Sequence, residues 1–365
     1  MIEIVADKDI PYLEEVFENS KSFRLKTLPF NEINKKTLKN SQALLSRSAT
    51  TINDELIEGT DIKFIFSLTS GEDHIDFDFL SSKEVFVKTA KGANAQAVLE
   101  YTLDALSFSS EKKIGLIGAG HIGSKLKKVL SFFNYETITF DPYKFEDSIY
   151  QKEAALRCPI ISVNASYSKK GDYPSHNLIS HLKPDQMLIN TSRGEVVDYK
   201  AILKNSNARL ICDVWDREPN LSMDDIGDTF IGTPHIAGNT LNSKMEALNW
   251  AIDSLKEFFD IDDLNNLRGI KKILNIDKLL EKHEIKKGEI PFKFIKSFID
   301  IKSISDSFKK DLDLYSEKDF FSNFFQSVRK KNERMGFGDY FLSSKFLNEE
   351  KKEILTLLGF KIQDE

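Results

Sequence analysis

The sequence predicts an α/β protein with two doubly wound, Rossmann-like domains of parallel sheet and a smaller C-terminal α+β domain. Short apolar segments alternate with helical stretches in the first 90 residues, and this alternation restarts near residue 112. The length of 365 residues is enough for two or three domains of about 150 residues each. We therefore expect a first domain at 1–92, completed by about 240–262, a second at 93–240 and a third at 268–365.

The first domain is predicted from five segments, four strand candidates and one helix candidate. In chain order they are IEIVAD (2–7), the helical PYLEEVFENS (11–20), QALLSRSAT (42–50), KFIFSLTS (63–70) and EVFVKTA (84–90). Such alternation indicates a parallel sheet with helices on its faces. The next segment, 93–108, predicts a helix that bridges two domains, because apolar residues recur at spacings of three and four: Ala97, Tyr101, Ala105 and Phe108.

The second domain is predicted from six apolar strand candidates. They are KKIGLIG (112–118), TITFDP (137–142), PIISVNA (159–165), QMLINTS (186–192), RLICDVW (209–215) and TFIGTPHIAG (229–238), and a helix at 242–259 follows. From about residue 268 the chain becomes rich in lysine and phenylalanine. Acidic residues are interspersed there, which favours a solvated helix face over a nucleic-acid patch.

Composition restricts the class of protein. The chain is 41% hydrophobic and 30% charged with a formal net charge of −6, which is typical of a soluble protein and does not favour a nucleic-acid partner. Cys158 and Cys212 both lie in apolar runs, so we expect buried free thiols in a reducing compartment and no metal site. No charged and apolar leader opens the chain, and no apolar stretch approaches the roughly 20 residues of a membrane span. We therefore expect a cytoplasmic protein that does not bind membranes.

A glycine motif follows the first strand of the second domain. Gly118, Gly120 and Gly123 have G-x-G-x-x-G order in GAGHIG, and a helical pattern begins directly after them. Glycines there permit a tight turn that brings backbone N–H groups to a pyrophosphate. The next strand ends in Asp141, eighteen residues after Gly123, where a carboxylate accepts hydrogen bonds from ribose hydroxyls and repels a 2′-phosphate. This pattern predicts NAD as the cofactor; the alternative is a glycine-rich turn without a ligand.

Three further strand ends carry polar residues that suit proton transfer and anion binding. Arg193 follows INTS, Glu218 follows CDVWDR and His235 follows IGTP. A guanidinium holds a carboxylate through paired hydrogen bonds, and a carboxylate beside an imidazole fixes its tautomer and favours its protonated form. Taken singly, the three could be a surface arginine, a loop carboxylate and a buried structural histidine. Together, behind a dinucleotide motif, they predict a dehydrogenase site.

The motifs SRG, DVWDREP and TPHIAG, in this order after GAGHIG, resemble those of the D-isomer-specific 2-hydroxyacid dehydrogenases over residues 1–260. Within that superfamily, IVADKDIPY, ALLSRSATTIN, SLTSGEDHID and GANAQAVLEY are similar to the erythronate-4-phosphate dehydrogenase family, and FFQSVRKKNERMGFGDYF resembles its C-terminal dimerisation domain. The resemblance implies catalytic roles for Arg193, Glu218 and His235, substrate contacts at Ser48 and Thr69, and cofactor contacts at Gly118, Gly120, His121, Ile122, Gly123, Asp141, Asp213 and Gly238. Arg47, next to Ser48, is a further candidate for phosphate binding, or else a structural ion-pair partner.

The resemblance implies a homodimeric enzyme that uses NAD to oxidise a phosphorylated 2-hydroxy acid. The substrate it implies is 4-phospho-D-erythronate, oxidised to 2-oxo-3-hydroxy-4-phosphobutanoate on the route to pyridoxal 5′-phosphate. Two positions depart from the family pattern: Asn164-Ala165-Ser166 stands where relatives carry His-x-Pro, and Asn239 stands where a tyrosine is expected. The alternatives are a dehydrogenase of another 2-hydroxy acid, such as 3-phosphoglycerate, and a non-catalytic NAD-sensing protein.

Overall fold

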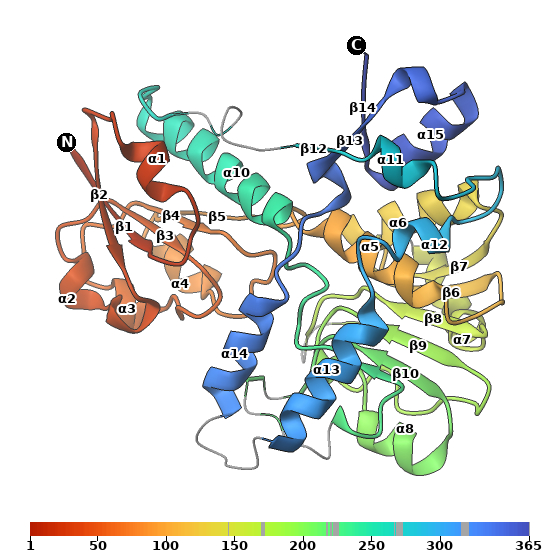
Figure 1. Ribbon diagram of the computed structural model, residues 1–365. Helices are drawn as coiled ribbons and strands as arrows, with labels where there is room; N and C mark the ends of the chain where they lie inside the picture. Colours follow the sequence, from red (N-terminus) through yellow and green to blue (C-terminus); the bar gives the residue numbers. More distant parts are fainter. Residues whose placement is uncertain are drawn as a thin grey trace. The chain divides into compact units, whose positions relative to one another are not determined.

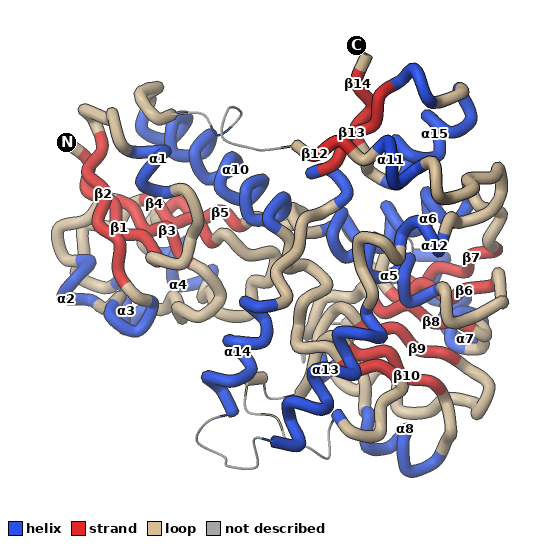
Figure 2. The backbone as a smooth tube through the Cα atoms, viewed as in Figure 1, coloured by secondary structure: helices blue, strands red, loops and turns tan. Residues whose placement is uncertain are grey.

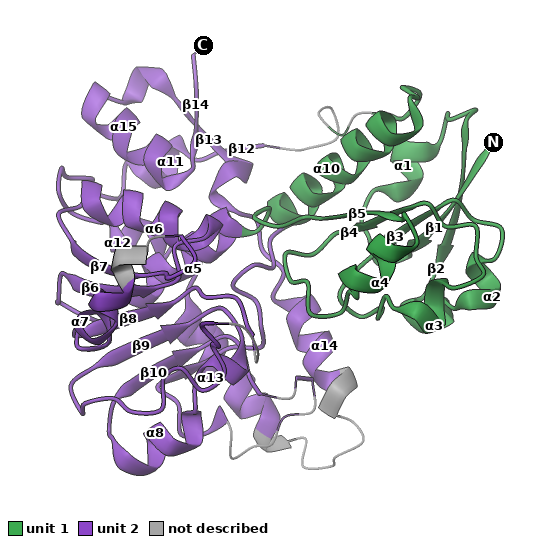
Figure 3. Cartoon of the chain, turned by 180° about the vertical axis from the view of Figure 1, so that it is seen from behind, with its two compact units in different colours: residues 1–94, 241–272 green, residues 95–240, 273–365 purple. Residues whose placement is uncertain are grey.

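The computed structural model describes residues 1–144, 146–168, 172–216, 218–219, 221, 226–265, 267, 273–314 and 321–364. The chain forms two compact units, Met1–Asn94 with Leu241–Lys272, and Ala95–Thr240 with Ile273–Glu365 (Figure 3). Among the described residues, no helix is both long enough and apolar enough to span a membrane. The predicted α/β class, with a parallel sheet in each of the two large domains, is confirmed (Figure 1).

The first unit contains a five-stranded parallel sheet of order β2-β1-β3-β4-β5. The strands are β1 (Ile2–Asp7), β2 (Phe23–Leu28), β3 (Ala43–Ser46), β4 (Phe64–Ser67) and β5 (Phe86–Thr89). The helices are α1 (Leu13–Phe17), α2 (Lys35–Leu38), α3 (Asp54–Ile57), α4 (Phe77–Ser82) and α10 (Leu241–Phe259), with a 3-10 turn at Phe30–Glu32. Helix α10 thus completes the first unit, in the part of the chain (about 240–262) that the sequence analysis assigns to it.

Successive side chains of this sheet enter two separate cores, because neighbouring residues of a strand point to opposite faces. In β1, Ile4 and Ala6 pack with α1 and α10, whereas Val5 packs with α2, α3 and α4. Both faces are therefore covered by helices. This explains why the central strands β3 and β4, buried at every position, are continuous apolar runs.

Strand β2 was not predicted from the sequence. Its segment, FRLKTL, buries only Phe23 completely, and its charged residues Arg24 and Lys26 are accessible to solvent. It pairs with β1 alone, from Ile2 opposite Phe23 to Asp7 opposite Leu28. An edge strand needs no continuous apolar pattern, so pairing with a buried neighbour decided its structure.

The second unit contains a six-stranded parallel sheet of order β11-β10-β9-β8-β6-β7 (Figure 2). Its strands coincide with the six predicted segments: β6 (Lys113–Ile117), β7 (Glu136–Phe140), β8 (Ile160–Val163), β9 (Met187–Asn190), β10 (Arg209–Cys212) and β11 (Ile231–Gly232). Helices α5 (Ala95–Leu106) and α6 (His121–Phe132) pack on one face, and α7 (Lys152–Leu156) and α8 (Tyr199–Asn205) on the other. Short 3-10 turns lie at Glu146–Gln151 and Gly194–Val196. Cys158 and Cys212 are free and buried, as predicted.

The strand order places a topological switch beside β6. Strand β6 pairs with β7 on one side and with β8 on the other, and the two connections leave in opposite directions. The loops after β6 and β8 therefore separate at the carboxyl edge of the sheet. Ligands of doubly wound sheets bind at such a crevice.

Residues 273–364 lie in the second compact unit. They contain a three-stranded parallel sheet, β12 (Leu274–Asn275), β13 (Tyr340–Ser343) and β14 (Lys361–Gln363). Its helices are α11 (Asp277–Leu280), α12 (Phe292–Ile295), α13 (Ile301–Leu314), α14 (Phe321–Lys331) and α15 (Glu349–Leu358), with 3-10 turns at Phe337–Asp339 and Ser344–Phe346. Buried residues of this segment, Phe294, Phe337 and Phe360 among them, share one apolar core with α5 and α6. We call residues 273–364 the C-terminal segment.

Polar contacts also fasten the C-terminal segment to α5. The carboxylate of Glu100, fully buried in α5, forms an ion pair with Arg334 and accepts a hydrogen bond from the Phe337 N–H at 2.9 Å. Gln96 donates to the Leu358 carbonyl at 2.7 Å, and the Ile301 N–H donates to Asp104 Oδ2 at 2.8 Å. A buried pair of opposite charges loses several kcal/mol when one partner is removed, so these contacts fix the segment on α5.

Asp104 makes the stability of this junction depend on pH. Burial, opposed by the Ile301 hydrogen bond, raises the pKa of Asp104 to about 6. The unfolded pKa is about 3.9, so the folded protein holds the proton more tightly, and stability falls as pH rises from about 4 to about 6. We expect Asp104→Asn to be more stable than the wild type at pH 7.5. The advantage should shrink by on the order of 1 kcal/mol at pH 5, as measured by urea unfolding.

The control for this experiment is Asp253→Asn, which changes an exposed carboxylate on α10 in the other unit. It should leave the difference from wild type the same at both pH values. An Asp104→Asn protein whose stability relative to wild type does not vary between pH 5 and 7.5 would contradict the assignment.

Candidate active site

The glycine motif forms the turn between β6 and α6. Gly118 has φ +95°, and a Cβ there would lie 2.7 Å from the Ala165 backbone nitrogen. A Cβ on Gly123 would lie 2.0 Å from the Gly118 carbonyl oxygen, so this glycine permits the close packing of helix on strand. A Cβ on Gly120 would meet nothing within 4 Å. The first and third glycines are thus required by the fold, whereas the second leaves open space at the N-terminus of α6.

Asp141 lies at the end of β7, beside this turn. Its Oδ2 accepts a hydrogen bond from the Ala119 N–H at 2.7 Å, and its Oδ1 accepts one from the Lys144 N–H at 3.2 Å. The Lys144 ammonium in turn donates to the Ala119 carbonyl at 2.8 Å. The carboxylate is therefore held against the turn, where a ribose of a bound dinucleotide is expected.

The residues present fit a dinucleotide. His121, exposed, and Ile122, half-buried, begin α6 directly after Gly120, whose surroundings are open. Two buried atoms at neighbouring strand ends, Asn164 Oδ1 after β8 and Thr191 Oγ1 after β9, have no hydrogen-bond partner among the described residues. Such atoms are rarely left unpaired in a folded protein, and polar groups of a ligand can satisfy them. Asn164 stands where relatives were expected to carry His-x-Pro.

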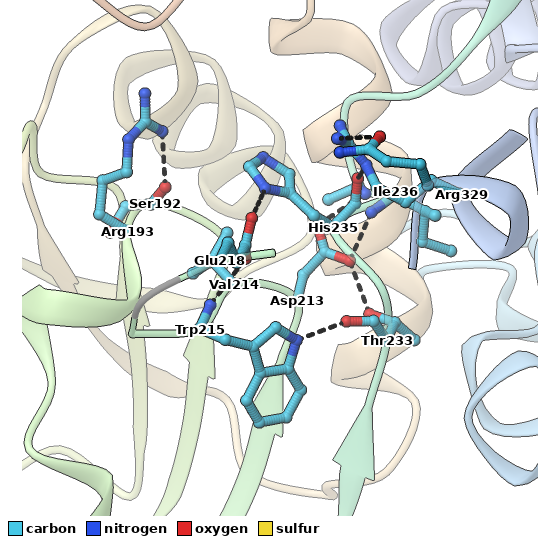
Figure 4. Close-up of polar contacts among 12 residues, drawn as sticks. Ser192, Arg193, Asp213, Val214, Trp215, Glu218, Thr233, His235, Ile236 and Arg329 are labelled. Carbon is cyan, nitrogen blue, oxygen red and sulfur yellow. Dashed lines mark hydrogen bonds and ion pairs between the residues drawn. The ribbon is translucent and has the colours of Figure 1, made fainter. Parts of the chain in front are cut away.

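His235 and Glu218 are in direct contact (Figure 4). His235 Nδ1 lies 2.5 Å from Glu218 Oε2, and the Trp215 N–H donates to Glu218 Oε1 at 2.8 Å. Burial tends to raise the pKa of Glu218, but the charge and hydrogen bond of His235, the charge of Arg329 and the Trp215 N–H outweigh it, so this pKa lies below its usual value. Because Nδ1 faces an ionised carboxylate, it carries the proton and leaves the Nε2 lone pair to accept another.

Asp213, at the end of β10, holds the turn that carries His235. Its Oδ1 accepts hydrogen bonds from Thr233 Oγ1 at 2.6 Å and from the Ile236 N–H at 2.7 Å, and its Oδ2 accepts from the Ala237 N–H at 2.7 Å. Asp213 is buried, which raises its pKa, while the same hydrogen bonds favour the charged form. The resemblance implied a cofactor contact at this residue. In the structure its carboxylate fixes the backbone on which the histidine stands.

Arg193 follows β9 in a loop that packs tightly against the segment before Glu218. A Cβ on Gly194 would lie 2.0 Å from the Trp215 carbonyl carbon. The two backbone segments can therefore approach only because residue 194 is glycine. Asn190 secures the loop by donating to the Arg193 carbonyl at 2.9 Å. The Arg193 guanidinium donates to the Ser192 carbonyl at 2.8 Å. The structure thus places Arg193, Glu218 and His235 at the carboxyl ends of β9, β10 and β11 in one sheet (Figure 4).

The predicted substrate residues lie in the other unit. Ser48 is exposed after β3, and Thr69 Oγ1 lies 3.0 Å from Ser67 Oγ at the end of β4. The Arg47 guanidinium is bound by carboxylates: its Nε donates to Asp7 at 2.9 Å and its Nη2 to Asp9 at 2.7 Å. Arg47 thus has the ion-pair contacts of the structural interpretation, and the aspartates balance the charge that a phosphate would use.

Sequence reasoning did not find Arg329, which lies on α14. Its Nε donates to the His235 carbonyl at 3.1 Å, and its charge is one of those that lower the Glu218 pKa. Gly238 and Asn239 complete the turn after His235, with the Thr240 N–H donating to the Gly238 carbonyl. Nothing in the spacing of α14 signals this contact, because 94 residues separate the two partners.

Comparison with known proteins agrees with this geometry. Residues 84–237 match the model of the D-isomer specific 2-hydroxyacid dehydrogenase, NAD binding domain. The NAD-bound 3-phosphoglycerate dehydrogenase of Entamoeba histolytica superposes with a TM-score of 0.59 at 21% identity, over 71% of this chain and 95% of that one. For the Aquifex aeolicus D-lactate dehydrogenase the values are 0.57, 22%, 71% and 95%. Fold and motif together define an NAD-dependent dehydrogenase of the D-isomer-specific 2-hydroxyacid class.

Similar sequences identify the family within this class of dehydrogenases. The erythronate-4-phosphate dehydrogenase of Hahella chejuensis is 36% identical over 67% of this chain and 68% of its own. That of Photorhabdus laumondii is 32% identical over 70% and 74%, and that of Coxiella burnetii 31% identical over 75% and 79%. The chain belongs to the erythronate-4-phosphate dehydrogenase family.

The three glycines should respond differently to alanine. Gly120→Ala has space for its Cβ in the protein but places it where a pyrophosphate approaches the backbone, so NADH affinity should fall at least tenfold with the melting temperature unchanged. Gly123→Ala forces a Cβ against the Gly118 carbonyl and should destabilise the fold, at about 1–3 kcal/mol for overpacking. NADH fluorescence titration and thermal unfolding separate the two effects. Full NADH affinity in Gly120→Ala would show that the turn does not hold the cofactor.

Proposed function

We propose that the chain oxidises 4-phospho-D-erythronate to 2-oxo-3-hydroxy-4-phosphobutanoate, a step of pyridoxal 5′-phosphate biosynthesis. The observation that carries the proposal is the 2.5 Å contact between His235 Nδ1 and Glu218 Oε2, at the same carboxyl edge of the six-stranded sheet as a glycine turn that fits a dinucleotide. The names of the curated relatives support the substrate. An imidazole backed by a carboxylate is the base that oxidation of a secondary alcohol requires.

His235 is the proposed base. With its proton on Nδ1 and shared with Glu218, the ring accepts the substrate hydroxyl proton at Nε2, and the carboxylate stabilises the imidazolium that results. The low pKa of Glu218 keeps this carboxylate ionised at neutral pH. Arg193 is proposed to hold the substrate carboxylate through paired hydrogen bonds and to stabilise negative charge on the reacting oxygen.

The cofactor pyrophosphate is proposed to bind at the turn between β6 and α6, at Gly118, Gly120, Gly123, His121 and Ile122. Its ribose is proposed to bind Asp141. Gly238 and the buried oxygens of Asn164 and Thr191 line the same edge of the sheet. A nicotinamide cofactor held there would supply the acceptor for the hydride from C2 of the substrate. A carboxylate at position 141 repels a 2′-phosphate, which favours NAD over NADP.

In the other unit, Ser48 and Thr69 are proposed to contact the substrate. Both follow neighbouring strands of the five-stranded sheet, so their side chains lie at the same edge. Arg47 is proposed to contribute to phosphate binding together with Ser48, although Asp7 and Asp9 already bind its guanidinium. Asp7 and Asp9 are accordingly part of this proposed site.

The residue at position 239 favours testing a second substrate, such as 3-phosphoglycerate. Asn239, where the family pattern has tyrosine, donates its side-chain N–H to the Arg329 carbonyl at 2.8 Å, so in this chain its amide serves a contact within the protein. A panel of 2-hydroxy acids that includes 4-phospho-D-erythronate and 3-phosphoglycerate, assayed at fixed NAD, distinguishes the substrates. Tight NADH binding without oxidation of any of them would favour an NAD-sensing protein.

A cytoplasmic homodimer is also proposed. The two buried free thiols support a reducing compartment, and the family resemblance of the C-terminal segment supports dimerisation. Light scattering on the full-length protein measures the oligomeric state; a monomer at micromolar concentration would contradict the dimer.

His235→Gln tests the proposed mechanism. The amide cannot accept the hydroxyl proton, so turnover should fall by about 10²- to 10⁴-fold, the usual contribution of a general base, while NADH affinity stays the same. The control His181→Gln changes an exposed histidine and should keep full activity. Turnover of His235→Gln within a factor of two of wild type would remove the histidine from the mechanism.

A further inference from the structure

The turn that carries His235 has a conformation that its own sequence does not favour. His235 has φ +55°, in the left-handed region that residues other than glycine rarely adopt. Such a conformation persists only where the surrounding structure holds it from more than one side. Asp213 supplies one side, by accepting hydrogen bonds from the N–H groups of Ile236 and Ala237.

The C-terminal segment supplies the other side. Arg329 Nε donates to the His235 carbonyl at 3.1 Å, and Asn239 Nδ2 donates to the Arg329 carbonyl at 2.8 Å. Each side chain thus bonds the backbone of the other's segment. We call this pair of hydrogen bonds the 239/329 clasp. Figure 4 shows Arg329 reaching the turn from α14, on the opposite side of His235 from Arg193.

Further contacts join the same two segments. Ser305 Oγ on α13 accepts a buried hydrogen bond from the Gly232 N–H of β11 at 3.0 Å. Beyond the turn, Thr240 and Arg334 form a parallel bridge, and the Arg334 N–H donates to the Asn239 carbonyl at 3.4 Å. Arg334 itself is paired with the buried Glu100. The short strand β11 and the turn after it are therefore held by the C-terminal segment before, at and after the histidine.

We propose that Arg329 is a positioning residue of the dehydrogenase site: through the 239/329 clasp, the C-terminal segment sets the orientation of His235 toward Glu218. The inference rests on the proposed role of His235 as the base. It gives the C-terminal segment a part in turnover that is separate from dimerisation. It also gives Asn239 a role, because its amide donates to the Arg329 carbonyl at 2.8 Å.

The positive charge of Arg329 lowers the pKa of Glu218, so its removal should change the pH dependence of turnover in a known direction. The described groups that face Glu218 are His235 from the turn after β11, Arg329 from α14 and Tyr199 from α8. Burial raises the pKa of Tyr199 well above its usual value, so it stays neutral, while Asp213 lies buried beneath the turn. Arg329 is thus the permanent positive charge among these groups. Without it the Glu218 pKa rises, and the carboxylate becomes protonated, and unable to support His235, at a higher pH than in the wild type.

The test compares Arg329→Gln, Arg329→Lys and Asn239→Ala in the full-length protein. Arg329→Gln should lower kcat about 10- to 100-fold, as expected for a lost hydrogen bond to a charged donor, with KM and NADH affinity within about threefold of wild type. Its acidic limb in the pH profile of kcat/KM should move to higher pH. Arg329→Lys should keep the limb in place, and Asn239→Ala should lower kcat without moving it.

The matched control is Lys330→Gln, which removes one positive charge from the adjacent, exposed position on α14. It should leave kcat and the pH profile unchanged. The inference is overturned if Arg329→Gln keeps kcat within twofold of wild type with an unmoved acidic limb, or if Lys330→Gln moves the limb equally.

A second readout separates this inference from the proposed function. If the wild type oxidises no 2-hydroxy acid, the proposed function fails, and the clasp is judged by proton NMR of histidine-labelled full-length protein. The Nδ1 proton of His235, shared with Glu218 over 2.5 Å, should give a strongly downfield signal in wild type and Lys330→Gln. Arg329→Gln should lose or shift that signal; an unchanged signal overturns the inference.

Discussion

The contact between His235 and Glu218 depends on a backbone conformation that a histidine rarely adopts. With φ at +55°, the turn after β11 directs the imidazole toward the loop after β10, and hydrogen bonds on two sides hold it there. Asp213 binds the N–H groups that follow the histidine, and Arg329 binds its carbonyl. An imidazole whose position depended on its side chain alone would sample several rotamers. Here the backbone is fixed first, and the ring then needs only one further bond, to Glu218, to become oriented.

The same logic applies to the cofactor edge of the sheet. A parallel sheet brings the carboxyl ends of all its strands to one side, so the glycine turn after β6, Asp141 after β7 and the polar loops after β9, β10 and β11 share an edge without any sequence proximity. Glycine occurs where two backbone segments are in close contact, at Gly123 against the Gly118 carbonyl and at Gly194 against the Trp215 backbone. Close packing of the backbone thus sets the positions from which the polar side chains of the site extend.

Much of this arrangement could be predicted from sequence. The six strands of the second unit, the dinucleotide turn and the order of Arg193, Glu218 and His235 depend on short-range patterns, such as an apolar run followed by a turn and a polar residue. Strand β2 was missed because an edge strand with one buried residue has no such pattern. The carboxylates around Arg47, the use of Asp213 to hold a turn, and the contact from Arg329 were missed for a different reason. Each joins residues that are 20 or more positions apart, and none leaves a periodic signal.

By itself the sequence determined the α/β class, the cofactor turn and the residue types of the site, because backbone propensity, hydrophobic period and glycine placement act over a few residues. Tertiary structure decided that Glu218 contacts the imidazole, that Asp213 holds the turn which carries it, and that the C-terminal segment joins the second unit through Glu100 and Arg334. These outcomes depend on burial and on distances of about 3 Å between remote segments. Such distances are set only when the sheet and its covering helices have packed. Buried polar groups then form hydrogen bonds with whichever groups the fold has placed beside them.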